Sequence, residues 1–226
     1  MPLPHTIRLA CVCALMALGV SAHAAPARLS ITVDGVDAGL PIAAPQVLCV
    51  PTKDGKSDKI EDVIRPTIRW SGAPAGTKSF AVFMMDPDVP ADFTDAGKVG
   101  KTIAADAKRQ DFFHWGVVDI AADVNIIQGG LAKLPLASGR ELPNDLGAAG
   151  YVPTPGQYGG PCPPWNDARI HHYHFIVLAL SDTVTVGKDE TAKAAFNRLI
   201  DSPSLLDKAA VVGTYTLNQK LRAEGK

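Results

Sequence analysis

The chain has 226 residues, of which 46% are hydrophobic and 20% are charged. This is the composition of an ordinary globular protein with enough apolar material for one sizeable core. The formal net charge of −1 gives no electrostatic basis for binding nucleic acid or an anionic membrane surface, so neither partner is expected.

The N-terminal segment has the pattern of a signal peptide. Arg8 supplies a positive charge, residues 9–20 form an apolar stretch too short to span a bilayer, and a small-x-small cleavage site ends at Ala24. We therefore expect residues 1–24 to be removed, and a periplasmic or secreted chain without a transmembrane segment to start at Ala25. The alternative, an N-terminal anchor helix, would require further apolar residues after this stretch.

Two cysteines remain once this peptide is removed. Cys11 and Cys13 leave with it, whereas Cys49 and Cys162 stay in the mature chain. In an oxidising compartment an even pair of cysteines predicts a disulfide, and two buried free thiols are the alternative.

The first strands are predicted from alternation. Eighteen prolines and twenty glycines interrupt the chain, which favours short strands joined by turns. Apolar and polar residues alternate over residues 29–33 and are followed by a turn at Asp34-Gly35, which predicts an early hairpin. Alternation returns over residues 66–70, with the large apolar side chains on one face.

Longer apolar runs predict strands that are buried on both faces of a sheet. They cover residues 80–85, 112–120 and 173–180. Between the first two lies a polar loop, residues 91–111, which has no usable periodicity. A loop of this length inside a compact domain is uncommon and is often functional or mobile.

Helix is predicted only near the C-terminus. Apolar residues at helical spacing predict an amphipathic helix over residues 190–200. Ser202 and Pro203 have the pattern of an N-cap and a first helical residue, which predicts a second short helix through Ala209 before a closing strand at residues 211–217. No repeat, linker or composition shift divides the mature chain, so we expect a single, mainly β domain.

A Gly/Pro-rich loop precedes a histidine-rich strand within residues 151–180. Its prolines fix φ and donate no N–H, while its glycines allow turns that other residues resist. The loop leads through three histidines into the last apolar run. A stiff loop at the mouth of a core strand, with imidazoles at the junction, is how a binding site is commonly built.

Acidic and imidazole groups stand at the ends of the predicted buried strands, where they are costly unless they are paired or used. They are Asp86, His114 and the cluster His171–His174. Alternation sends His171 and Tyr173 to one face of their strand and His172 and His174 to the other, so the clustered histidines do not form one site. We expect His172 and His174 to be satisfied locally.

Four motifs occur in one order along the chain, with apolar strands between them. They are Asp86-Pro87-Asp88-x-Pro90, His114-Trp115, Gly159-Gly160-Pro161-Cys162-Pro163-Pro164 and His171-His172-Tyr173. Together they resemble the phosphatidylethanolamine-binding protein family, in its bacterial Raf-kinase-inhibitor-like branch, from about residue 66 to residue 180, with weaker support from residues 213–215. The resemblance implies a β-sandwich of antiparallel strands with a few peripheral helices, over residues 25–226.

The resemblance also implies a small pocket for anions such as phosphate and phospholipid head groups. Carried over residue by residue, this pocket holds Asp86, His114, His171 and Tyr173, with the Gly160-Pro161 loop as one wall. His172 stands where the family usually has an arginine, and residues 91–111 are longer than the bacterial pattern. Both differences bear on the choice of partner.

The chemistry of these side chains suits an anion. Imidazolium and phenol groups can donate hydrogen bonds to phosphate oxygens, and histidine's reference pKa of ~6.5 lets it carry charge near neutral pH. We therefore expect His114, His171 and Tyr173 to bind a small anion, a phosphate ester or a phospholipid head group. Asp86 is expected to orient an imidazole and stabilise its charged form. We expect no cofactor, no bound metal and no catalysis.

Three other functions remain open. A metal enzyme could use His114, His171 and Asp86, since zinc accepts such ligands, although no helical motif such as HExxH is present. A Ser–His–Asp hydrolase would need a nucleophile turn of the GxSxG type, which is missing. An interaction protein could inhibit a protease or kinase through its surface, with a partner that the sequence does not identify.

Overall fold

The computed structural model describes residues 28–225 except residues 155, 184 and 188. The predicted signal peptide, residues 1–24, and the expected new N-terminus at Ala25 therefore lie outside the described residues. Within the described part of the chain, no helix is both long enough and apolar enough to cross a membrane.

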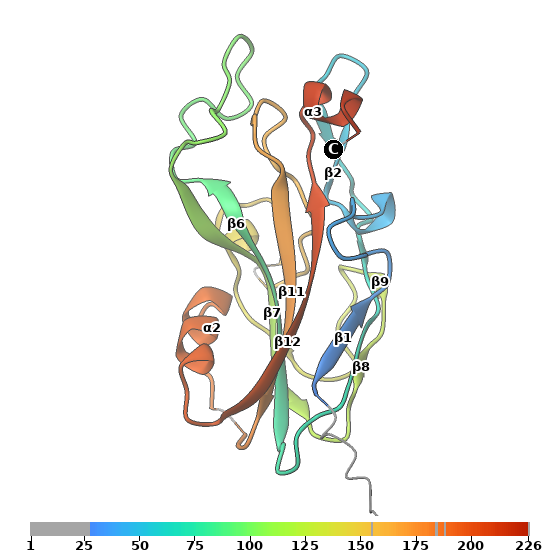
Figure 1. The fold of residues 1–226 in the computed structure, drawn as a ribbon, viewed down its shortest axis with the longest axis vertical. Helices are drawn as coiled ribbons and strands as arrows, with labels where there is room; N and C mark the ends of the chain where they lie inside the picture. The colour runs from blue at the N-terminus through green and yellow to red at the C-terminus, as the bar shows by residue number, and fades with distance from the viewer. Residues whose placement is uncertain (1–27, 155, 184, 188, 226) are drawn as a thin grey trace, which may run out of the picture.

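A five-stranded antiparallel sheet forms the larger layer of the molecule (Figure 1). Its strands, in spatial order, are β10 (Arg140–Glu141), β7 (Arg109–Ala121), β6 (Ser79–Pro90), β11 (His171–Leu180) and β12 (Leu205–Tyr215). The central strands β6 and β11 are buried over most of their length, as their continuous apolar runs predict.

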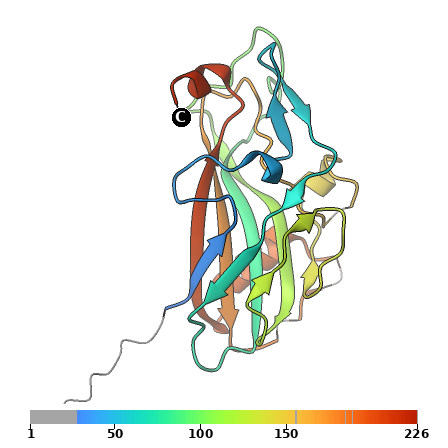
Figure 2. The same cartoon turned by 90° about the vertical axis from the view of Figure 1, so that its right-hand side faces the viewer.

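A smaller sheet packs against one face of the first, so that two layers face each other (Figure 2). Its spatial order is β1 (Ser30–Val33), β5 (Ile68–Ser71) and β8 (Ile126–Ile127). Alternation along β5 buries Ile68 and Trp70, and the ring centroids of Trp70 and Phe80 lie 5.3 Å apart. The main core fills the space between these layers.

The opposite face of the large sheet is covered by α2 (Ala192–Ile200). Its N-cap is Thr191, whose side-chain oxygen accepts a hydrogen bond from Ala194 N. The helix lies very close to β7, because a Cβ added at Gly116 would stand only 2.7 Å from Ala192 Cβ. The predicted amphipathic helix and its buried face are thus confirmed.

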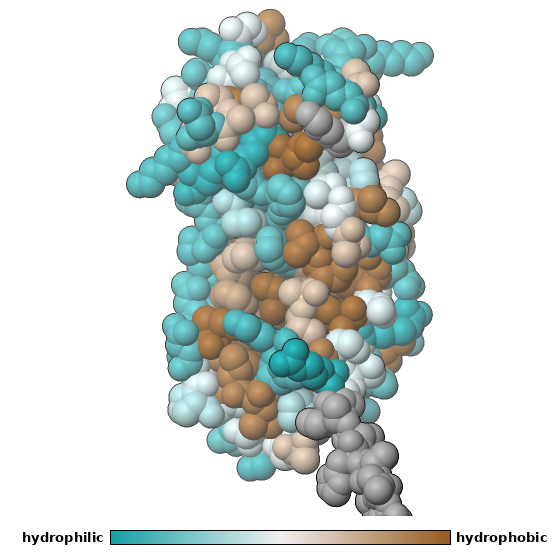
Figure 3. Space-filling model, in the orientation of Figure 1, coloured by the Kyte–Doolittle hydropathy of each residue, from teal (hydrophilic) through white to brown (hydrophobic). Residues whose placement is uncertain are grey.

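Short elements gather around the rest of the sandwich, and several cap its upper end in Figure 1. They are η1 (Ala44–Gln46), β2 (Cys49–Pro51), β3 (Ser57–Lys59), β4 (Ile64–Arg65), β9 (Gly130–Leu131), α1 (Asp145–Ala148) and α3 (Gln219–Ala223). On the face shown in Figure 3, hydrophobic residues lie mainly over the middle and lower part, whereas the upper end is mostly hydrophilic. The expected mainly β sandwich with a few peripheral helices is confirmed.

The short helix predicted from Ser202 and Pro203 to Ala209 is wrong. Strand β12 begins at Leu205 and pairs with β11 along its whole length, so tertiary pairing overrides the local N-cap pattern. Its residues alternate between more and less exposed positions, which is a strand period. The second C-terminal helix is α3 instead, and its N-cap Asn218 accepts from the backbone of the first turn.

The prediction of an early hairpin is also wrong. The turn at Asp34-Gly35 returns the chain only as far as an isolated bridge between Val33 and Val36. Strand β1 pairs instead with β5, which lies far ahead in the sequence. A local turn signal therefore did not identify the partner strand.

Candidate functional site

A cavity of about 570 Å³ is lined by residues of β2, β3, β6, β7, β11 and the loops between them. Its deep end comes from three neighbouring strands: β6 contributes Asp86, β7 contributes His114, and β11 contributes His171 and Tyr173. Because β6 lies between β7 and β11, side chains that are distant in sequence meet toward one end of these three inner strands. The structure thus brings together the four side chains that the sequence motifs suggested.

His171 is fully buried between two carboxylates. Its Nδ1 lies 2.6 Å from Asp86 Oδ2, and its Nε2 lies 3.2 Å from Asp167 Oδ2. Burial alone would lower the pKa of His171, but hydrogen bonds and charge from Asp167 and Asp86 outweigh it and raise the pKa to about 9. The ring is therefore an imidazolium at neutral pH.

This environment changes the role expected of His171. Both ring nitrogens already face carboxylates, so neither is free to donate to a ligand. The expectation that His171 donates to an anion is corrected, because the imidazolium is a fixed part of the floor. The orienting contact expected of Asp86 is present, and its other oxygen accepts from Asp88 N at 2.8 Å.

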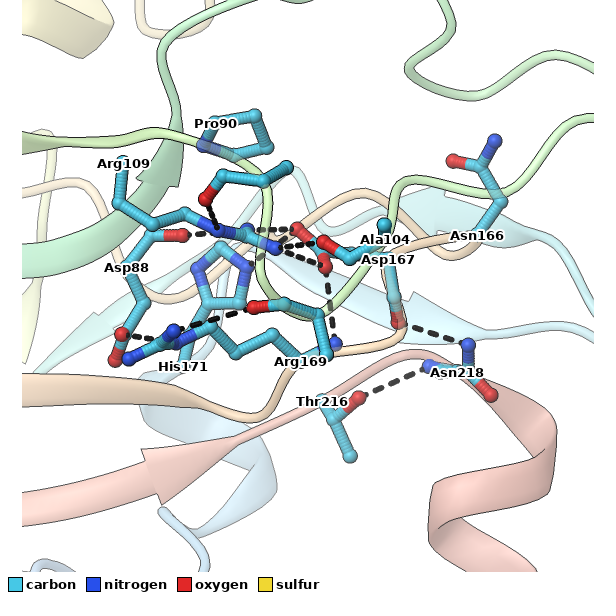
Figure 4. A network of polar contacts seen from close by, with 12 residues as sticks. Asp88, Pro90, Ala104, Arg109, Asn166, Asp167, Arg169, His171, Thr216 and Asn218 are labelled. Atoms are coloured by element: carbon cyan, nitrogen blue, oxygen red, sulfur yellow. Dashed lines mark hydrogen bonds and ion pairs between the residues drawn. The ribbon is translucent and has the colours of Figure 1, made fainter.

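Asp167 is a second partner of His171 that the sequence reasoning missed. It also forms a two-pronged ion pair with Arg109, at 2.5 Å and 3.0 Å (Figure 4). The other arginine of the network, Arg169, binds Asp88 at 2.6 Å. These pairs join residues separated by 58 and 81 positions, so no local spacing could have revealed them.

His114 has the opposite environment. Its Nδ1 lies 3.0 Å from the carbonyl oxygen of Gly159, which can only accept, so Nδ1 carries the proton. Burial lowers the pKa of His114, so the ring is neutral at neutral pH. Its Nε2 is then an acceptor, and this buried atom has no hydrogen-bond partner among the described residues.

Tyr173 is the second polar group at the deep end whose hydrogen bonds are incomplete. Its ring meets His114 edge to face, with centroids 5.2 Å apart, and stacks on His171 at 6.4 Å. Burial raises the pKa of Tyr173 well above its usual value, and the charge of Asp86 raises it further. The neutral hydroxyl is buried close to the Asp86 carboxylate, but within the described part of the chain it makes no hydrogen bond of normal geometry.

Gly160 and Pro161 lie behind the cavity and not in its wall. The carbonyl of Pro161 accepts from Leu48 N at 2.9 Å and from Cys49 N at 3.2 Å. A Cβ on Gly160 would stand 2.1 Å from the backbone oxygen of Gln46, so only glycine permits this approach. The two residues fix the loop in place, which corrects the expectation that they form a wall.

The wall itself is made by the residues that follow. They are Cys162, Pro163, Pro164 and Trp165. The predicted disulfide is confirmed: Cys49 and Cys162 are bonded, and both cysteines line the cavity. The bond therefore ties β2 to the Gly/Pro-rich loop at the site.

The mouth of the cavity carries aromatic side chains that the sequence reasoning did not single out. Phe93 and Tyr151 are each 48% exposed, and Trp165 is half-buried. We call these three residues the aromatic rim. Lys59 is the exposed cation beside them. They lie in segments without periodicity, so only the folded chain reveals their common position.

The other two histidines of the His171–His174 cluster lie on the other side of the sheet, as alternation predicts. His172 is half-exposed, and its Nδ1 lies 2.7 Å from Asp88 Oδ2. His174 lies on the same outer face. Neither lines the cavity.

The structure gives no support to a metal site at the deep end. His171 would have to break contacts with two carboxylates before either nitrogen could bind a metal. Among the described residues, no group of three or more His, Cys, Asp or Glu side chains has an arrangement that could hold a metal ion.

Comparison with known proteins identifies related chains. Residues 45–216 match the phosphatidylethanolamine-binding protein family. A UPF0098 protein of Aquifex aeolicus is 34% identical over 74% of this chain and 78% of its own length. Escherichia coli YbcL, another UPF0098 protein, is 33% identical over 67% of this chain and 71% of its own.

The fold agrees with these matches. The crystal structure of Escherichia coli YbcL, described as a new member of the mammalian PEBP family, superposes with a TM-score of 0.61 and 25% identity. The alignment covers 84% of this chain and 99% of YbcL. The structural likeness therefore extends over nearly the whole of that relative.

Proposed function

Because the chain belongs to the phosphatidylethanolamine-binding protein family, we propose that it binds a small phosphate ester or phospholipid head group in this cavity, without converting it. One observation carries the proposal. Two buried polar atoms at the deep end, His114 Nε2 and Tyr173 Oη, have no partner in the described structure. A buried polar atom without a partner costs about 1–3 kcal/mol, and a ligand that satisfies it recovers this free energy.

The two atoms require different hydrogen-bond partners. Tyr173 can donate its proton to an anionic oxygen, whereas neutral His114 can only accept at Nε2. A phosphate monoester that keeps one proton offers both partners, an oxygen that accepts and a hydroxyl that donates. The second pKa of a phosphate monoester is about 6, so this form becomes scarcer as pH rises above neutrality.

We propose binding without catalysis because the described residues offer no activated nucleophile beside the pocket histidines. In the described part of the chain, no serine hydroxyl hydrogen-bonds to either pocket histidine. The cysteines in the wall are joined as a disulfide and carry no free thiol. Nucleophilic catalysis needs such a group beside a base.

The first prediction tests ligand binding by calorimetric titration with phosphate and phosphoethanolamine. Tyr173→Phe removes one hydroxyl at constant ring shape, and we expect it to weaken binding about tenfold to hundredfold, since a hydrogen bond to a charged group contributes about 1.5–3 kcal/mol. His114→Gln should weaken binding similarly. In the wild type, affinity should fall about tenfold per pH unit above pH ~7, as the ligand loses its proton.

The matched control is His172→Gln, which changes a histidine on the outer face of β11, the strand that also carries Tyr173. It should bind as the wild type does. Unchanged affinity in both Tyr173→Phe and His114→Gln would refute the proposed site.

We also propose that the protein works outside the cytoplasm, which the disulfide supports because such bonds persist in oxidising compartments. N-terminal sequencing of the protein from a periplasmic or secreted fraction should begin at Ala25, within a residue. Recovery of the exported protein with Met1 intact would contradict this second prediction.

A further inference from the structure

In the loop between β6 and β7, residues 91–108, the middle part is held by the buried side chain of Asn166. Asn166 is 5% exposed, and its Oδ1 accepts from Gly97 N at 2.9 Å. Its Nδ2 donates to the backbone oxygens of Asp95 at 2.9 Å and Lys101 at 3.1 Å. These contacts give a long polar loop one defined course.

The base of the same loop is held by the ion-pair network below the cavity. Arg109 Nη2 donates to Ala104 O at 2.7 Å while the guanidinium binds Asp167, as Figure 4 shows. Arg169 Nη1 donates to Ala105 O at 3.2 Å. Asp167 also contacts His171, so one network positions both the floor of the cavity and the loop.

This fixed loop presents apolar surface to the cavity. Phe93, Ala96 and Gly97 line it, and a Cβ added at Gly97 would stand 3.7 Å from Trp165 Nε1. With Tyr151 from the segment after α1, the aromatic rim is built from three separate segments. Half-exposed aromatic rings at the mouth of a cavity are placed to contact a ligand.

The charges on the cavity lining decide what kind of group these rings receive. Aromatic side chains can hold either a flat apolar group or an organic cation. The charged side chains lining the cavity are Lys59, Asp86 and His171, and the His171 imidazolium offsets Asp86. Lys59 therefore leaves the empty lining net positive, and Asp86, the carboxylate among the described lining residues, is already paired, so no anionic side chain of this lining is free to pair with an ammonium at the rim.

We propose that the aromatic rim selects phosphate monoesters of uncharged aromatic alcohols over zwitterionic esters such as phosphoethanolamine and phosphocholine. This inference rests on the proposed function, because the phosphate occupies the deep end at His114 and Tyr173. The remaining volume, within a cavity of about 570 Å³, receives the ring. Phe93 is the specificity-determining residue that the loop supplies.

Calorimetric titration with phenyl phosphate, phosphoethanolamine, phosphocholine and inorganic phosphate tests the proposal. Phenyl phosphate should bind about tenfold more tightly than the zwitterionic esters. Phe93→Ala should weaken the binding of phenyl phosphate about twofold to tenfold, as expected for the loss of one aromatic pair. The affinity for inorganic phosphate should not change. Val99→Ala is the matched control, since Val99 lies on the same loop, is 78% exposed and does not line the cavity.

The outcomes separate the two proposals. Inorganic phosphate that binds, with phenyl phosphate no tighter than phosphoethanolamine, overturns the role of the rim and leaves the proposed function standing. Tighter binding of phosphocholine overturns it in favour of a cation site. If none of the four ligands binds, the proposed function fails and the rim inference fails with it.

Discussion

Two histidines at one site have opposite protonation because their partners differ. His171 lies between two carboxylates and is charged, whereas His114 faces a carbonyl in an apolar setting and is neutral. The same residue type therefore supplies a fixed cation in one position and an acceptor in the other. Environment and not residue type sets the role of each ring.

The third prediction is a loss of stability in mild alkali that comes from His171. Its pKa is about 9 in the folded protein and ~6.5 when unfolded, so the folded state holds the proton more tightly. This contribution is complete below pH ~6.5 and is lost as pH rises through 9. The free energy of unfolding should fall by about 3 kcal/mol over that range.

Urea unfolding at several pH values measures this fall, and NMR titration of the imidazole resonances assigns it. The ring of His171 should titrate near pH 9, and that of His114 below its ordinary value. A His171 ring that titrates near 6.5, with stability flat up to pH 9, would show that the two carboxylates do not hold the proton.

At the scale of elements, the buried strands and α2 could be predicted because their signals are local. Continuous apolar runs predicted β6, β7 and β11, and apolar residues at helical spacing predicted α2. The first half of β12 could not be predicted, because its residues also fit a capped helix and only pairing with β11 decides between them. Its second half overlaps the closing strand expected at residues 211–217. Local patterns can identify a helix or a strand, but where a segment fits both, its pairing with a neighbouring strand decides which one forms.

The residues of the candidate site also fall into those that the sequence predicted and those that it did not. The four side chains at the deep end of the cavity were identified from motifs, and the order of strands in the sheet then explains why they meet. Asp167 lies only four positions before His171, but it precedes the strand and neither a strand nor a helix period predicted the contact. Arg109 and the aromatic rim were also not identified, because their roles depend on contacts between segments far apart in the sequence. Loop 91–108 shows this most clearly, since its course depends on Asn166, well over fifty positions away.

At the scale of the whole molecule, one covalent bond closes the chain around the site. The disulfide joins Cys49 and Cys162, which are 113 positions apart, so the loop it closes includes β6, β7 and most of the cavity lining. The hydrogen bonds from Leu48 N and Cys49 N to Pro161 O hold the same junction without it. Reduction should therefore lower stability without abolishing the fold.

The last prediction puts a magnitude on this bond. In the chain-entropy model, a crosslink that closes a loop of this length stabilises the folded state by about 4–5 kcal/mol, mainly by restricting the unfolded chain. Dithiothreitol should therefore lower the urea midpoint of the wild type, with the native circular dichroism spectrum retained in the absence of urea. The Cys49→Ala/Cys162→Ala variant should show the lowered midpoint from the start and no response to dithiothreitol. An unchanged wild-type midpoint after thiol counting has verified full reduction would mean that the unfolded chain is already confined by other contacts.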